Sequence, residues 1–264
     1  RPSLSRSPDP AMSDAEASYT LDVDGRSIAV RALPGRGPGV LWMGGFKSDM
    51  TGTKAEHLHH WAASRGSAYV RFDYSGHGAS GGAFEDGTIS KWLEESLAVF
   101  DQATEDEQIV VGSSMGGWLA LLLARALAAR GEKRLKALVL IAPAPDFTEV
   151  LMWARFPPPA RELIEKTGRL FKPSLYGEDP YVITHALIED GRRNLILGAP
   201  FQVGCPVRIL QGAKDEDVPW EHAMRLVTCL AEDDVVFSLV KDGDHRLSRP
   251  EDLERLTAAL EEFA

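Results

Sequence analysis

The chain has 264 residues, of which 44% are hydrophobic and 26% are charged, an ordinary composition for a folded domain with a substantial core. Its 29 basic and 39 acidic residues give a formal net charge of −10, which argues against a nucleic-acid partner, since proteins that bind nucleic acids carry basic patches. No apolar run approaches the roughly 20 residues that cross a bilayer, so we expect no membrane partner. Two cysteines, Cys205 and Cys229, are too few for a disulfide framework, and we expect buried thiols in a reducing compartment.

The N-terminal end differs in composition from the rest of the chain. Residues 1–11 contain three prolines, three serines and no apolar run, so we interpret them as an expression scar or disordered tail. The remainder is expected to form one domain, because it is of the usual size. Its core would comprise residues 12–142 and 206–264, with an insertion at residues 143–205 between the sixth and seventh strands.

Strand-like and helix-like segments alternate along this core. The predicted strands are residues 19–23, 27–33, 39–43, 68–72, 108–111, 135–141, 207–211 and 235–240. The predicted helices are residues 53–65, 88–103, 115–130, 219–230 and 250–263. Asp24-Gly25 joins the first two strands and predicts a hairpin at one edge. Apolar strands separated by helices predict an α/β fold, with a mostly parallel central sheet and helices on both faces.

The insertion at residues 143–205 contains no clear strand pattern. Its sequence has three consecutive prolines at 157–159, and we expect helices at 160–171 and 181–192. Long insertions in compact domains are usually functional, so we interpret this one as a helical lid, with an ordinary pair of packing helices as the alternative. Trp153 and Phe156 would line a hydrophobic acyl pocket, or else hold the lid down.

The segment Gly112-Ser113-Ser114-Met115-Gly116 fits the pattern G-x-S-x-G. It follows a predicted strand and opens a predicted helix, which is the setting that places a nucleophilic serine on a strained turn. The helix N-terminus after Ser114 favours developing negative charge through its unpaired N–H groups and its dipole. Ser114 is therefore the candidate nucleophile, because Ser113 stands one place too early. The alternative is a Gly/Ser turn that only caps a helix.

A serine acyl-transfer enzyme also needs two N–H donors for the oxyanion. One donor comes from the residue after the nucleophile, Met115. The other comes from the loop after an early strand, which here is Gly44-Gly45-Phe46, so we expect the Phe46 N–H to serve. Gly45 would let the backbone approach the bound substrate closely. A simple turn is the alternative interpretation of this loop.

His245 is the candidate base, because it follows the last predicted strand, where ligand chemistry sits in sheets of this kind. The candidate acid is Asp215, in the loop after the preceding strand. Asp217 is the alternative, but its place before Pro219 suits a helix cap. Asp146, after the sixth strand, is a remote second choice.

Other polar groups receive structural interpretations. The glycine-rich turn at residues 73–80 follows a strand and would shape the floor of the site. His57, His59 and His60 lack a plausible fourth ligand, and no dinucleotide or phosphate-loop motif is present. The sequence therefore implies no metal and no organic cofactor.

Taken together, these motifs resemble the α/β-hydrolase superfamily over nearly all of residues 18–264. The closer likeness is to the subgroup of the mitochondrial acyl-protein thioesterase (depalmitoylase) and acyl-glucuronide esterase, which has bacterial relatives; it rests on residues 45–55, 71–76, 112–118, 212–220 and 244–246. The resemblance implies a catalytic triad of Ser114, Asp215 and His245. In place of the superfamily's common His-Gly, this chain has Gly44-Gly45, so the hydrogen bonding of the oxyanion loop does not follow from the resemblance.

The sequence thus predicts a serine hydrolase that cleaves carboxylic esters or thioesters through an acyl-enzyme intermediate. The substrate would be a small-molecule ester or thioester, or an acylated protein, with an apolar acyl chain or an aromatic acid. The alternatives are a C–C bond hydrolase, an amidase or peptidase with the same triad, and a ligand-binding receptor with little turnover. Because no transit peptide is recognisable, we expect a cytoplasmic bacterial enzyme, or a processed mitochondrial form.

Overall fold

The computed structural model describes residues 15–172 and 180–264, so the predicted tail at residues 1–11 lies outside the described residues. Eight of the described strands form one sheet in the order β1-β2-β4-β3-β5-β6-β9-β10. These strands are β1 (Ala17–Val23), β2 (Arg26–Leu33), β3 (Arg36–Met43), β4 (Ser67–Phe72), β5 (Gln108–Ser113), β6 (Leu135–Ile141), β9 (Val207–Gly212) and β10 (Val235–Val240). β1, β2 and β4 pair antiparallel, whereas the strands from β4 to β10 pair in parallel. The predicted sheet and its edge hairpin are confirmed.

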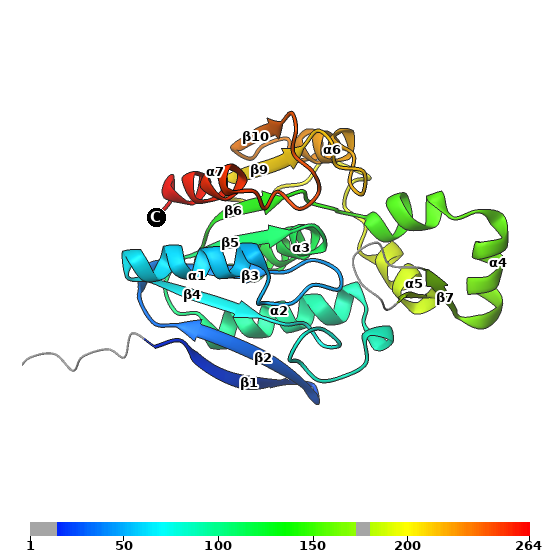
Figure 1. Ribbon diagram of the computed structural model, residues 1–264, viewed down its shortest axis with the longest axis horizontal. Coiled ribbons are helices and arrows are strands. Elements are labelled where there is room, and N and C mark those ends of the chain that lie inside the picture. The colour runs from blue at the N-terminus through cyan, green and yellow to red at the C-terminus, as the bar shows by residue number, and fades with distance from the viewer. Residues whose placement is uncertain (1–14, 173–179) are drawn as a thin grey trace, which may run out of the picture.

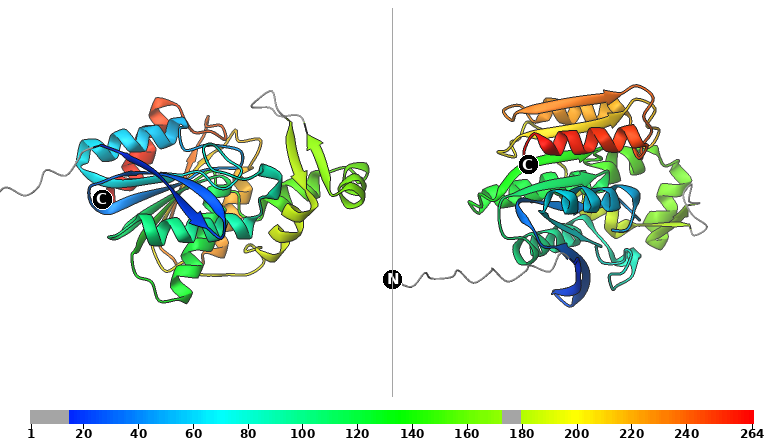
Figure 2. Two further views of the ribbon diagram at one scale, coloured as in Figure 1. Left: turned by 90° about the horizontal axis from the view of Figure 1, so that it is seen from below. Right: turned by 60° about the vertical axis from the view of Figure 1, so that its left-hand side comes forward.

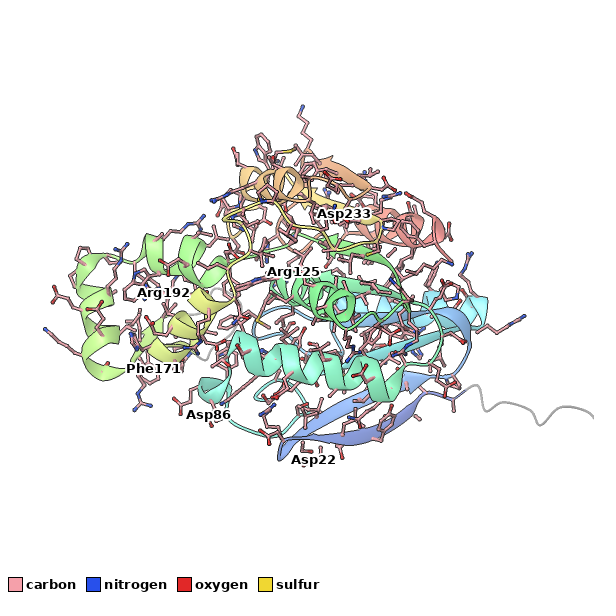
Figure 3. All side chains as sticks on the ribbon, turned by 180° about the vertical axis from the view of Figure 1, so that it is seen from behind. Asp22, Asp86, Arg125, Phe171, Arg192 and Asp233 are labelled. Carbon is pink, nitrogen blue, oxygen red and sulfur yellow. The ribbon has the colours of Figure 1, made fainter. Side chains whose placement is uncertain are left out.

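Helices cover both faces of this sheet, as predicted. They are α1 (Thr53–Arg65), α2 (Ile89–Ala103), α3 (Met115–Ala129), α6 (Trp220–Cys229) and α7 (Pro250–Glu261). α1 and α7 contribute to a hydrophobic cluster on one face, and α2, α3 and α6 contribute to a larger cluster on the other (Figures 1 and 3). Within the described residues, no helix combines the length and the apolar character needed to cross a membrane.

The central strands and α3 are mostly apolar because other parts of the protein cover them on both sides, and Arg125 of α3 lies at an exposed position. All six residues of β5 are buried, and Trp118 and Leu121 of α3 are fully buried between the sheet and its neighbours. Burying each large aliphatic side chain contributes about 1.5–3 kcal/mol, so this region supplies much of the stability that holds the sheet edge in place. Cys205 and Cys229 are free and buried.

The insertion departs from the predicted helices. It contains the short helical turns η2 (Thr148–Met152) and η3 (Trp153–Arg155), the helix α4 (Pro158–Thr167), the strands β7 (Arg169–Lys172) and β8 (Tyr181–Thr184), and the helix α5 (His185–Arg193). The prediction of a helix at 160–171 was wrong at its C-terminal end, and that of a helix at 181–192 was wrong at its N-terminal end, because β7 and β8 occupy these positions. α4 stops at Gly168, which has a left-handed φ of 79°, and β7 then pairs antiparallel with β8. Thr184 begins α5 by accepting a hydrogen bond from the Leu187 N–H.

The insertion projects from one end of the sheet, and its α5 end is fastened to the core (Figures 1 and 2). Asp190 of α5 accepts hydrogen bonds from the N–H and the hydroxyl of Ser90, both at 2.8 Å. Asp146 accepts hydrogen bonds from the N–H groups of Ile196 and Leu197, at 2.8 and 2.9 Å. Asp146, the remote second choice for the catalytic acid, therefore joins the beginning of the insertion to the segment that follows α5.

Candidate active site

Four loops converge at the carboxyl edge of the parallel strands. They follow β3, β5, β9 and β10 and carry Phe46, Ser114, Asp215 and His245, respectively. Because parallel strands end at the same edge of a sheet, side chains that are remote in sequence meet there. This edge is the candidate active site.

Ser114 sits on the sharp turn between β5 and α3, with φ 54° and ψ −116°. This left-handed φ is unusual for a residue other than glycine and is stable only where the surroundings enforce it. The neighbouring glycines show why the turn is tight: a Cβ on Gly112 would lie 2.4 Å from the Gly116 carbonyl oxygen, and one on Gly116 would lie 2.1 Å from the Met43 carbonyl oxygen. A side chain at either position would displace the turn that presents Ser114.

His245 lies within hydrogen-bonding distance of both other predicted triad residues, Ser114 and Asp215. Nε2 of His245 lies 3.1 Å from Oγ of Ser114, and Nδ1 of His245 lies 2.8 Å from Oδ2 of Asp215. The carboxylate requires a proton on Nδ1, which leaves the lone pair of Nε2 to accept the serine proton. The arrangement has the geometry of an activated serine nucleophile.

Asp215 is held rigidly, since its side chain is fully buried and accepts hydrogen bonds at both oxygens. Oδ1 accepts the N–H groups of Asp217 and Val218, at 3.0 and 2.8 Å. Oδ2 accepts the Gln211 side-chain amide at 3.1 Å in addition to His245. Four donors on one carboxylate fix its orientation towards His245. Gln211 was missed by the sequence analysis, because a glutamine at the end of a strand has no distinctive local pattern.

Asp217 has a different environment. α6 begins after Pro219 without any side-chain cap, so the predicted capping role of Asp217 was wrong. Asp217 instead lines the cavity beside the triad. Ligand atoms of Asp215, Asp217 and His245 lie within 4.8 Å of one another, a spacing that could hold a metal ion. The four donors already on Asp215 fit an acid that orients a histidine better than a metal ligand.

The proposed oxyanion donors lie beside the nucleophile. A Cβ on Gly45 would lie 3.4 Å from Cβ of Ser114, so the backbone of this loop passes next to the nucleophile. Phe46 and Met115 both line the same cavity as Ser114. Met115 is the first residue of α3, where backbone N–H groups have no partner inside the helix. The Phe46 ring packs edge-on against Phe84, with ring centroids 4.9 Å apart. This contact restrains the loop through the Phe46 side chain.

A cavity of about 610 Å³ opens onto the triad. The apolar part of its lining, here called the apolar wall, comes mainly from the insertion: Ala144, Phe147, Leu151, Met152, Phe156 and Ile183. The core contributes polar lining residues, here called the polar wall: Lys47, Asp49, Thr53, Lys54, Arg246 and Ser248. The cavity therefore offers both apolar and polar contacts to a molecule at Ser114.

The two lid residues singled out from the sequence differ in position. Phe156 lines the cavity, whereas Trp153 does not belong to its lining. The Trp153 ring instead contacts the guanidinium groups of Arg161 and Arg192, whose Cζ atoms lie 5.7 and 4.9 Å from the ring centroid. Figure 3 labels Arg192 within the insertion. Trp153 thus packs within the insertion, and neither of the two roles considered for it is decided by these contacts.

Lys54 is a site residue that the sequence analysis missed. Its Nζ donates hydrogen bonds to the Arg246 carbonyl oxygen at 2.5 Å and to Oγ of Ser248 at 3.2 Å, which ties α1 to the loop that carries His245. Burial lowers the pKa of Lys54 to about 8, although Asp244 opposes the shift. The only sequence signal was its place in the segment 45–55 that carries the family resemblance.

Comparison with known proteins shows the family of the chain. Residues 32–256 match the Alpha/beta hydrolase family. The mitochondrial palmitoyl-protein thioesterase ABHD10 of Mus musculus is 37% identical over 238 residues, which cover 90% of this chain and 78% of that protein. The chain therefore belongs to the α/β hydrolase family, and the resemblance seen in the sequence motifs is confirmed.

Two solved structures show the same likeness in three dimensions. A putative hydrolase from Agrobacterium vitis S4 superimposes with a TM-score of 0.89 at 48% identity, covering 94% of this chain and 98% of that one. The mouse α/β hydrolase domain-containing protein 10 superimposes with a TM-score of 0.83 at 34% identity, covering 93% of this chain and 97% of that one. The similarity spans the insertion as well as the core.

Proposed function

We propose that this protein is a serine hydrolase that cleaves carboxylic esters or thioesters through an acyl-enzyme intermediate. The observation that carries the proposal is the chain of hydrogen bonds from Asp215 through His245 to Ser114, beside a cavity that Ser114 and His245 line. A serine hydroxyl is inert at neutral pH unless a base removes its proton, and this chain of hydrogen bonds supplies the base and the acid that orients it.

The reaction proceeds in two halves. In the first, Oγ of Ser114 attacks the acyl carbon while its proton moves to Nε2 of His245, and the N–H groups of Phe46 and Met115 stabilise the oxyanion. The tetrahedral intermediate collapses, and His245 gives the proton to the leaving alcohol or thiol. In the second half, His245 removes a proton from water, which attacks the acyl-enzyme and releases the carboxylic acid and Ser114. Asp215 stays ionised throughout.

The two walls of the cavity suggest how the substrate lies. The apolar wall, which includes Phe147, Leu151 and Phe156, suits a medium or long acyl chain or an aromatic acid. The polar wall then faces the leaving group. The curated relative described above is named a palmitoyl-protein thioesterase, which supports thioesters and acylated proteins as candidate substrates beside small-molecule esters.

The test is a panel of p-nitrophenyl esters of increasing chain length, acyl thioesters of N-acetylcysteamine, and matched p-nitroanilides. We expect turnover of esters and thioesters, with little or none of the anilides. Ser114→Ala should lower kcat by a factor of about 10³ or more. Ser64→Ala, the same chemical change at an exposed site on α1, is the matched control and should retain full activity. Full activity of Ser114→Ala, or preferential cleavage of the anilides, would contradict the proposal.

A further inference from the structure

We propose that His77 is a positioning residue for the oxyanion loop, acting through a hydrogen bond that its Nε2 accepts from the Lys47 N–H. The two atoms are 3.1 Å apart. The inference rests on the proposed function, because it assigns a task to His77 within the same acyl-transfer site. The segment that carries His77 was interpreted from the sequence only as a structural turn.

The oxyanion loop needs outside support, because neither Gly44 nor Gly45 has a side chain. Its conformation is also strained: Lys47 has a φ of 57°, which a residue with a side chain adopts only when its surroundings enforce it. The Phe46 N–H lies in the first of two consecutive peptide planes, and the second plane restrains it through the backbone of Phe46. The first joins Gly45 to Phe46, and the second joins Phe46 to Lys47.

Each of these planes is held by a different side chain. The Gly45 carbonyl oxygen accepts hydrogen bonds from Oγ and from the N–H of Ser48, at 2.7 and 3.2 Å. Because a trans peptide directs its N–H away from its C=O, this contact aims the Phe46 N–H. The second plane is fixed by His77, which receives the Lys47 N–H. Without His77 the second plane is released, and the left-handed conformation of Lys47 loses its support.

His77 is itself held firmly in place. Only 4% of its surface is exposed, and its ring packs edge-on against Tyr74, Phe84 and Trp92, with ring centroids 5.6, 5.1 and 5.2 Å apart. Phe84 also contacts the Phe46 ring, so the same aromatic group touches both the histidine and the loop. Such packing leaves the imidazole little freedom to rotate.

Hydrogen bonds select the imidazole tautomer of His77 that can accept the Lys47 N–H. Nδ1 lies 3.1 Å from the Ser75 carbonyl oxygen, so it carries the proton and donates it there. Ser75 in turn donates its N–H and its hydroxyl to the buried carboxylate of Glu95, at 2.9 and 2.6 Å. Nε2 is then left as an acceptor for Lys47. Burial lowers the pKa of His77 to about 4, and the nearby charge of Lys47 acts in the same direction, so the ring stays neutral at working pH.

The experiment compares His77→Phe, which keeps a ring but removes the acceptor, with His77→Gln, whose side-chain oxygen restores an acceptor. For p-nitrophenyl ester hydrolysis we expect His77→Phe to lower kcat by about 10- to 100-fold, with KM changed less than about twofold, because oxyanion donors act in the transition state. His77→Gln should recover at least about a third of the lost activity on a logarithmic scale.

A second measurement isolates the oxyanion. An alkyl trifluoromethyl ketone adds to Oγ of Ser114, the serine proton passes to His245, and the ketone oxygen becomes an oxyanion. Its affinity should fall in His77→Phe by the same factor as kcat. The affinity of the product carboxylic acid should change less than about twofold, since the acid makes ground-state contacts.

The matched control is Ser80→Ala in the same turn. Ser80 bonds to the Ala29 N–H and to the Asp73 carbonyl oxygen, at 2.8 and 2.6 Å, so its loss disturbs this turn without removing the acceptor for Lys47. We expect lower thermal stability in Ser80→Ala, with kcat within about twofold of the original.

Equal kcat values for His77→Phe and Ser80→Ala, or an unchanged ketone affinity, would overturn the inference. If His77→Phe does not fold, His77→Leu provides the test, because it also removes the acceptor for the Lys47 N–H and should show the same selective loss of kcat and ketone affinity. Failure of the proposed function would look different: Ser114→Ala would remain active. An enzyme that depends on Ser114 and tolerates His77→Phe would overturn this inference alone.

Discussion

The carboxyl edge of the sheet and the insertion at residues 143–205 meet at the same cavity, but they are built in different ways. At the edge, the backbone decides the structure: glycines allow close approach, and buried acceptors receive several donors each. The insertion is tied to the core by single side chains such as Asp190, which bonds to Ser90. In the proposed function the edge supplies the chemistry, and the insertion shapes the site for the acyl group.

The solvent exposure of side chains also differs between the edge and the insertion. Asp215 and His77 at the edge are 6% and 4% exposed, whereas Leu163 and Phe171 in the outer part of the insertion are 45% and 56% exposed. Figure 3 labels Phe171 near the outer end of the insertion. Because a domain loses stability when buried contacts are cut and loses little at exposed sites, substitutions should have larger effects at the edge.

The largest expected effect separates the two candidate acids at the edge. Asp215→Asn should lower kcat by about 10⁴-fold, because an amide favours the wrong tautomer of His245. Asp217→Asn should lower kcat less than about 10-fold, since Asp217 lines the cavity and it is Asp215 that lies 2.8 Å from Nδ1 of His245. Steady-state kinetics on one p-nitrophenyl ester measures both. The reverse order of effects would move the acid to Asp217.

The next effect concerns stability in acid. Burial holds the pKa of His77 at about 4 in the folded protein, whereas the unfolded chain binds the same proton near 6.5. The unfolded state therefore binds more protons between these values, and stability falls as the pH drops from 6.5 towards 4. His77 should account for a loss of about 3 kcal/mol over this range. Urea unfolding at several pH values should show a shallower decline for His77→Phe, and an identical slope in both proteins would contradict this prediction.

A smaller effect tests how the insertion is fastened. Asp190→Asn keeps the shape of the side chain but replaces one acceptor oxygen with a donor facing the N–H and hydroxyl of Ser90. We expect a loss of about 1–3 kcal/mol in unfolding free energy, together with a higher KM for long acyl substrates. Ser90→Ala should give part of the same change, because it removes one of the two bonds. Unchanged KM and stability in both variants would show that this contact does not hold the insertion.

The smallest effect concerns selectivity. Phe156→Ala removes a large apolar group from the cavity wall and should lower kcat/KM for long acyl chains by about 10-fold relative to short ones. Phe171→Ala, on the exposed part of β7, is the matched control and should leave the chain-length profile unchanged. A profile that moves equally in both variants would contradict an acyl site at this wall.

What could be predicted from the sequence depends on whether a feature is recorded in a local pattern of residues or only in a contact between remote segments. The strands, the turn at Ser114 and the order of Ser114, Asp215 and His245 follow local patterns of glycine, hydrophobicity and chain order. The β7–β8 pair was missed, because the two strands are short and pair across a segment with no tight-turn signal. His77 and Lys54 were missed for another reason: each acts through a contact with a remote segment, and no local pattern records such a contact.

The central claim is that Ser114 is the nucleophile, and covalent labelling tests it most directly. The protein is incubated with a fluorophosphonate, which forms an O–P bond to an activated serine with loss of fluoride, and the adduct is located by peptide mass spectrometry. We predict stoichiometric labelling at Ser114, retained labelling in Ser113→Ala, and none in Ser114→Ala. Labelling at Ser113, or an adduct that persists in Ser114→Ala, would contradict the account.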